Sequence, residues 1–259
     1  LLIIFLSLSF TSAFVFPDWL SRITGRITGQ AISDQGLVAH FQFENNFVDS
    51  VGGVVGSCSL GVSCPTFDVG KFGQAAKFDG VNDLINIGSV GDYTDKFTIS
   101  SWFKTSSAQK RPSITKRSSG LQYDIFINID GKLSFYDGVI HSSKSIVTDN
   151  EWHFGAIVID GSNSKIYVDG FAEATFTSKI IRRTNTGDSI IGAFLLDDRN
   201  YMDGMIDEVR VYNRPLSESE IRSLHTNLIA HYDFEDNVQD QSGNSHHGTM
   251  YNSPQFVTG

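Results

Sequence analysis

Carboxylate pairs are the first feature of this chain to consider for chemistry, because hydrolysis of glycosidic bonds needs two of them. On a β-strand such a pair would lie two or four residues apart, since alternate side chains share a face. The sequence contains no Glu-x-Asp-x-Glu or Glu-x-Asp-x-x-Glu run, and Glu218 and Glu220 begin a predicted helix, whose dipole they complement. Gly-x-Ser-x-Gly, His-Glu-x-x-His and phosphate-binding motifs are also absent from the sequence. We therefore expect no enzymatic activity.

Cysteine and histidine offer two further kinds of chemistry. Cys58 and Cys64 are the two cysteines of the chain, and no second ligand pair of the kind that a zinc site uses lies nearby. In an exported protein we expect them to close a small disulfide loop, with two buried thiols as the alternative. His246 and His247 look like a metal pair, but they have no spaced partner beyond Asp240, so we expect no metal there.

The composition describes an acidic globular protein. Of its 259 residues, 40% are hydrophobic and 19% are charged, and the net charge is −9 with a sequence pI of about 5.1. An acidic surface repels phosphate backbones, so nucleic acid is not an expected partner. The length is enough for one large all-β domain with additional segments.

The first 16 residues, LLIIFLSLSFTSAFVF, are a hydrophobic run without charge. This length is typical of the apolar core of a secretory signal peptide and is short for a membrane span. We therefore predict a signal peptide at residues 1–16, with a truncated anchor helix as the alternative, and a linker at residues 17–35. Both alternatives place the rest of the chain outside the cytoplasm, secreted or at the cell surface, with no further membrane insertion.

From Gly36 onward, short stretches of alternating apolar and polar residues predict β-strands. Six Asp-Gly pairs predict tight turns, because both residues tolerate positive φ. These pairs begin at residues 79, 130, 137, 160, 169 and 203. The strands are predicted at residues 37–43, from the segment 70–80, and at residues 84–88, 97–104, 122–129, 132–137, 152–159, 165–168, 189–192 and 205–212. The lack of βαβ alternation indicates an all-β, two-sheet antiparallel sandwich.

One last strand and one short helix close the predicted domain. Strict alternation would place Asp207 and Val209 on the same face of that strand. The segment Ser217-x-x-Glu220 is a capping box, so a short helix is predicted near Ser217–Leu224.

An internal repeat follows the helix. Residues 228–237, LIAHYDFEDN, repeat residues 37–46, LVAHFQFENN. We therefore predict a complete domain at residues 36–226 and the truncated start of a second copy at residues 228–259. A segment of that length is too short to bury a sandwich core of its own.

Taken together, six segments of the sequence resemble the LamG-like jelly-roll family, the concanavalin A-like sandwich related to laminin G modules and pentraxins. They are LVAHFQFENN, GKFGQAAKFDGVNDLINIG, FTISSWFK, EWHFGAIVIDGSNSKIYVDG, SIIGA and MDGMIDEVRVYNRPLSESEI. The resemblance implies a two-sheet jelly roll. Members of the family are typically extracellular and often in tandem, and they occur in adhesins, lectin-like modules and accessory domains of carbohydrate-active enzymes. Most of them are not catalytic.

Related modules also bind structural calcium, a cation that prefers carboxylate and carbonyl oxygens. Because the first and last strands of a jelly roll lie close together, Asp49 and Asp207 are candidate ligands at that seam. Asp197 and Asp198 are a second candidate set, in the loop before the last strand. The alternative is that these acids accept hydrogen bonds from nearby backbone N–H groups.

Aromatic side chains are the other candidates for ligand binding, because sugar rings stack on exposed aromatic faces. Tyr123, Tyr136 and Tyr201 are candidates at the concave face or rim of the sandwich, with ordinary strand tyrosines as the alternative. Trp102 and Trp152 lie among apolar neighbours, so core packing is expected for both.

These observations predict a non-catalytic recognition or adhesion module whose partner is a glycan or a cell-surface protein. Two alternatives stay open, an accessory binding domain of a glycan-active enzyme and a structural spacer in a surface protein. Fold alone does not choose among them.

Overall fold

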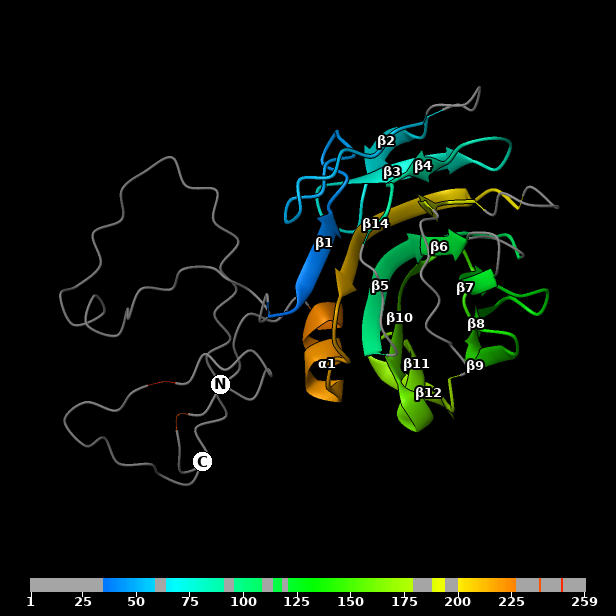
Figure 1. The fold of residues 1–259 in the computed structure, drawn as a ribbon. Helices are drawn as coiled ribbons and strands as arrows, with labels where there is room; N and C mark the ends of the chain where they lie inside the picture. Colours follow the sequence, from blue (N-terminus) through cyan, green and yellow to red (C-terminus); the bar gives the residue numbers. More distant parts are fainter. Residues whose placement is uncertain are drawn as a thin grey trace, which may run out of the picture. The chain divides into compact units, whose positions relative to one another are not determined.

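In a computed structural model, the chain forms two antiparallel β-sheets packed face to face, and one short helix covers part of the outer face of the larger sheet (Figure 1). The structure describes residues 35–58, 64–90, 96–108, 114–117, 121–178, 188–193 and 200–226, together with Val238 and Gly248. The predicted signal peptide, the linker up to residue 34, Asp197, Asp198 and most of the second copy lie outside the described residues. Among the described residues, no helix is long and apolar enough to span a membrane.

The larger sheet has eight strands in the order β12-β11-β10-β5-β14-β3-β2, with β1 paired to β14 beside β3. Its strands are β1 (Leu37–Phe41), β2 (Thr66–Val69), β3 (Gln74–Asp79), β5 (Lys96–Lys104), β10 (Trp152–Asp160), β11 (Ser164–Val168), β12 (Phe171–Phe176) and β14 (Asp203–Tyr212).

The smaller sheet has six strands in the order β4-β13-β6-β7-β8-β9. Its strands are β4 (Ile85–Asn86), β6 (Ile114–Arg117), β7 (Leu121–Ile127), β8 (Lys132–Tyr136), β9 (Ile140–Ile146) and β13 (Ser189–Ile191). A short 3-10 turn, η1 (Gly161–Asn163), joins β10 to β11. The predicted all-β sandwich is therefore confirmed.

Period-two alternation along β5 separates the two faces of the larger sheet. Phe97, Ile99 and Phe103 point into the core between the sheets. Trp102 points to the opposite face, where the helix α1 (Glu218–Thr226) covers it, and it is only 2% exposed. Both faces of this strand are buried along most of its length.

The sequence pattern predicted regular alternation along the closing strand. This prediction is wrong for β14. Its register against β5 shifts between Asp207 and Arg210, and Glu208 has a φ of 52°, so a β-bulge lies at this point. The extra residue changes the phase of the strand. Val209 is consequently buried in the core, whereas Asp207 lies on the outer face, opposite Trp102.

The predicted capping box is confirmed at the start of α1. The Glu220 amide donates to Ser217 Oγ at 3.3 Å, and the Ser217 amide donates to Glu220 Oε2 at 2.8 Å. Ile221 and Leu224 pack against the outer face of the larger sheet in the same apolar cluster as Trp102. The cap and this apolar edge together fix a helix of nine residues.

Four strands of the structure were not predicted from the sequence, namely β2, β6, β9 and β12. The turns at Asp130-Gly131 and Asp169-Gly170 are confirmed between their strands, and Asp169 and Gly170 both have positive φ. The predicted turn at Asp203-Gly204 is wrong, because these residues pair with β3 inside β14. Cross-strand pairing has overridden the local turn preference there.

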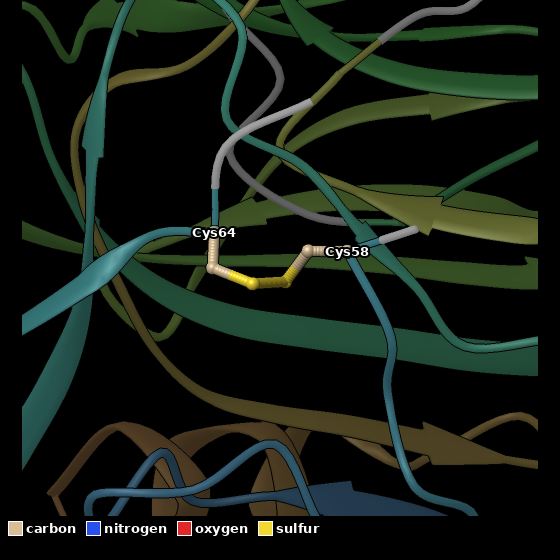
Figure 2. Close-up of a disulfide and its surroundings, with 2 residues drawn as sticks. All are labelled: Cys58 and Cys64. Carbon is tan, nitrogen blue, oxygen red and sulfur yellow. A yellow bond between two sulfur atoms is a disulfide. The ribbon is translucent and has the colours of Figure 1, made fainter. Parts of the chain in front are cut away.

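The predicted disulfide is confirmed between Cys58 and Cys64, whose Cα atoms are 5.2 Å apart (Figure 2). It closes a loop between the segment that follows β1 and the start of β2. No free cysteine occurs in the chain.

Candidate functional site

The outer face of the smaller sheet carries a continuous row of side chains that crosses all six strands. Antiparallel partners share a face, so the pairings place these residues side by side. From β4 to β9 the row consists of Asn86, Ile190, Thr115, Asp124, Tyr136 and Ile140. A hydrogen bond of 2.8 Å from Thr115 Oγ1 to Asp124 Oδ1 completes the row between β6 and β7.

The row is polar at its centre and at its β4 end, where Asn86 lies, and apolar at its β9 end. Thr115 and Asp124 are 3% and 5% exposed, and their hydrogen bond satisfies part of the polar surface buried there. Tyr136 is half-buried, and Ile140 beside it is 57% exposed. The Tyr136 ring therefore offers a ligand a stacking surface, with the apolar side chain of Ile140 beside it.

Tyr201 lies on this face as well. It packs against the small apolar cluster of Leu84, Ile190 and Ala193, and Ile190 belongs to the row. Strand spacing separates Ile190 on β13 from Tyr136 on β8 by about 14 Å. The structure thus brings two of the three candidate tyrosines to one face of the smaller sheet.

Tyr123 does not lie on this face. It is 1% exposed and its ring packs between those of Phe97 and Phe135 in the core. The sequence prediction placed it near a strand end, but it lies within β7, in phase with the inward-facing residues. Its role is core packing, and it is not a surface ligand-binding residue.

Asp49, the first candidate calcium ligand, accepts hydrogen bonds from its own loop and from β1. Its Oδ1 accepts from the amides of His40 at 2.8 Å and Val51 at 2.9 Å, and its Oδ2 accepts from the Gly52 amide at 2.8 Å. Both oxygens are therefore engaged by N–H donors, as the alternative prediction stated.

Asp207 lies on the outer face of the larger sheet and is completely buried. Its Oδ2 accepts a hydrogen bond of 3.0 Å from the Phe72 amide, in the loop that leads into β3. Burial raises the pKa of Asp207 to about 7, and the neighbouring Glu208 adds to this effect, whereas the Phe72 amide opposes it. The described residues contain no group of three or more acids, histidines or cysteines that could hold a metal with it.

The bulge residue Glu208 anchors a buried charge network that the sequence patterns had not indicated. Glu208 Oε2 contacts His40 Nε2 at 2.9 Å on β1 and also contacts Arg210 Nη2. Burial alone would raise the pKa of Glu208, but the hydrogen bond from His40 and the charge of Arg210 outweigh it and hold that pKa below its usual range. The network ties β1 to β14, so it stabilises the closure of the domain.

A second network missed by the sequence reasoning lies at the end of the sandwich where β10 begins. His153 Nδ1 contacts Asp169 Oδ2 at 2.8 Å, and its Nε2 contacts Asp149 Oδ1 at 3.0 Å. The hydrogen bond with Asp169 raises the pKa of His153, burial opposes it, and Asp149 adds to the rise. The imidazolium ion therefore links the β9–β10 loop to the β11–β12 turn. Only the Asp169-Gly170 turn motif pointed to this region.

Comparison with known proteins settles the family. A family model described as the Concanavalin A-like lectin/glucanases superfamily, of laminin G type 3, matches residues 79–222, which is more than half of the chain. The chain belongs to this superfamily. The resemblance found in the sequence is thereby confirmed. No curated protein matches the sequence of this superfamily member.

Solved structures agree with this superfamily fold. Domain 4 of AbnA, a GH43 extracellular arabinanase from Geobacillus stearothermophilus solved with arabinotriose, has a TM-score of 0.62 at 20% identity, over 73% of this chain and 98% of that one. The binding domain of Paraclostridial Mosquitocidal Protein 1 has a TM-score of 0.60 at 17% identity, over 81% and 55%. Trypanosoma rangeli sialidase, solved with sialic acid, has a TM-score of 0.58 at 17% identity, over 75% and 33%. The chain spans about half of the second protein and a third of the third, and identities this low establish the fold alone.

Proposed function

We propose that this domain is an extracellular, non-catalytic recognition module that binds a glycan on the outer face of its smaller sheet. The observation that carries the proposal is the row from Asn86 to Ile140, with Tyr136 and Tyr201 on one face. Half-buried tyrosines are suited to stacking on sugar rings, because they lose little conformational freedom on binding. A domain of the same fold, matched over 98% of its length, was solved with arabinotriose, which supports this ligand class.

The proposed location and lack of catalysis rest on separate features. A disulfide between Cys58 and Cys64 is typical of oxidising compartments, and it agrees with the predicted signal peptide at residues 1–16. Asp124 bonds Thr115, and Glu208 bonds His40 and Arg210, so these buried carboxylates already have structural partners. We therefore propose binding without hydrolysis.

We also propose that a second copy of the same domain begins at residue 228. In the first copy the Gly56 amide donates to the Phe47 carbonyl at 2.8 Å, in the loop after β1. After the repeated segment, the Gly248 amide donates to the Val238 carbonyl at 2.7 Å. Each glycine is also packed closely against the Cβ atom of its partner. Phe47 and Val238 follow the two repeated segments at the same spacing, so this shared contact supports a tandem arrangement.

A protein partner is the second candidate, and exposed isoleucines favour it. Ile140 and Ile146 of β9 are 57% and 61% exposed, and Ile129 at the β7–β8 turn is 75% exposed. Apolar surface of this kind is typical of contacts between proteins. The same edge of the smaller sheet would then serve as the interface.

A glycan-array assay on the purified chain tests the proposal. We expect wild-type binding to neutral glycans, and we expect Tyr136→Ala to weaken it about 10-fold, through loss of about 1.4 kcal/mol of stacking. Phe171→Ala is the matched control, because Phe171 is an exposed aromatic residue of β12 on the larger sheet. Equal loss in both variants, or no effect of Tyr136→Ala, would contradict the proposed face.

Absence of glycan binding in the wild type would favour a protein partner or a spacer. Repeating the array with a chelator distinguishes calcium-dependent binding from calcium-independent binding.

A further inference from the structure

Three buried polar atoms on the outer face of the larger sheet have no hydrogen-bond partner within the described part of the protein. They are Ser100 Oγ and Trp102 Nε1 on β5, and Asp207 Oδ1 on β14. The three residues are 1%, 2% and 0% exposed. Leaving one such group unpaired costs about 1–3 kcal/mol, so three of them on one face require a physical explanation.

The three residues are immediate neighbours in the sheet. Asp207 is the cross-strand partner of Trp102, and Ser100 is two residues from Trp102 on the same face of β5. Side chains of directly paired residues lie about 5 Å apart, and diagonal neighbours lie about 7–8 Å apart. The β-bulge at Glu208 keeps Asp207 on this face, because it breaks the alternation just after that residue.

One neighbour of these atoms in the sheet is a small side chain. Ser100 is paired on its other side with Ala156 of β10, so two small residues adjoin at this point of the sheet. Larger side chains cover this part of the outer face. The Phe72 ring and the His225 ring of α1 both pack on Trp102, at centroid distances of 6.1 and 5.4 Å.

The chemistry of the three atoms favours a neutral molecule over a cation. An indole N–H only donates, and a hydroxyl both donates and accepts. The carboxyl oxygen accepts when ionised and can donate when protonated, so water matches the three atoms with three hydrogen bonds in either state. A positive group already lies near the position, since Lys71 Nζ is 4.2 Å from the centre of the Trp102 ring, and the Phe72 amide already donates a hydrogen bond to Asp207. Glu208, the nearest second carboxylate, is occupied by His40 and Arg210.

We propose that Ser100, Trp102 and Asp207 bind one buried water molecule that joins β5 to β14 beneath α1 and the loop before β3. The water supplies the missing partner of each atom and completes the polar surface between the sheet and its cover. It also takes the structural place at Asp207 that the sequence had suggested for calcium.

A crystal structure of the whole chain at a resolution that resolves solvent tests this site. We expect a water peak within about 3.5 Å of Asp207 Oδ1, Ser100 Oγ and Trp102 Nε1. Ser100→Val fills the space beside Ala156 with methyl groups, and we expect it to remove the peak. Thr98→Val is the matched control on the same face, because the Thr98 hydroxyl already has partners in Arg214 O and Leu216 N, and it should leave the peak in place.

Two results would overturn the proposal. The first is a dry site in which the three atoms pair with other protein groups or remain unpaired. The second is a peak with ligand distances of about 2.3–2.6 Å and an anomalous signal of calcium. If Ser100→Val does not fold, oxygen-17 relaxation dispersion on the wild type and on Ser100→Ala provides the second measurement. We then expect a long-lived water in the wild type that exchanges faster in the variant, and equal relaxation in both would contradict the site.

Discussion

Replacing Asp207 by asparagine should make the domain less sensitive to pH between 5 and 8. Asp207 is completely buried, and burial raises its pKa from 3.8 to about 7. Between these two values the folded protein keeps a proton that the unfolded chain has lost. Stability therefore falls as the pH rises through this window, and it levels off above pH 7. An amide has no such titration, and its shape is close to that of the protonated carboxyl group.

The size of the effect follows from linkage. With pKa values of 3.8 in the unfolded chain and about 7 in the folded protein, the wild type loses about 3 kcal/mol from this group between pH 5 and pH 8. Urea unfolding of wild type and Asp207→Asn at pH 5, 6, 7 and 8, at constant ionic strength, measures the difference at each pH. We expect the free energy of unfolding of the variant, relative to that of the wild type, to rise by about 3 kcal/mol from pH 5 to pH 8. Most of this rise should occur below pH 7.

Asp49→Asn is the matched control, because Asp49 is also buried but accepts three backbone hydrogen bonds with its two oxygens. An amide offers one acceptor oxygen, so we expect a loss of about 1–3 kcal/mol for this variant. A difference between Asp207→Asn and wild type that stays constant within about 0.5 kcal/mol from pH 5 to 8 would refute the assignment of a raised pKa to Asp207.

Three further changes test other parts of the structure. Cys58→Ser with Cys64→Ser should lower the free energy of unfolding by about 2 kcal/mol, the loop-closure value for so short a loop, and urea unfolding with and without reductant checks it. His153→Gln should destabilise the domain by about 1 kcal/mol at pH 5–6, and the loss should shrink as the pH rises through the raised pKa of His153, because the wild type then loses its own ion pairs. A loss independent of pH would contradict this. Ser217→Ala should cost about 1 kcal/mol through loss of the helix cap, and unchanged thermal stability would show that the cap is unimportant.

Features set by neighbouring residues were predictable from the sequence. Recurring apolar residues identified β5 and β10, whose central positions are buried. Asp-Gly pairs identified turns, and Ser217 and Glu220 identified the start of α1. Each of these signals depends on local backbone geometry, which a short segment specifies by itself.

Features set by pairing between distant segments were decided only by the tertiary structure. β2, β9 and β12 lie at sheet edges and carry mixed, partly exposed residues, so their sequences lack the apolar pattern of the central strands. The bulge at Glu208 comes from the register of β14 against β5, and it decides that Asp207 lies on the outer face while Val209 enters the core.

The candidate sites divide in the same way. The sequence identified Tyr136 and Tyr201 by residue type, but strand order and pairing placed them on one face and placed Tyr123 in the core. It identified Asp49 and Asp207 as acids, but their hydrogen-bond partners depend on which loops fold over them. Residue chemistry is encoded locally, whereas burial and neighbours depend on contacts between residues far apart in the chain, and these form only when the two sheets assemble.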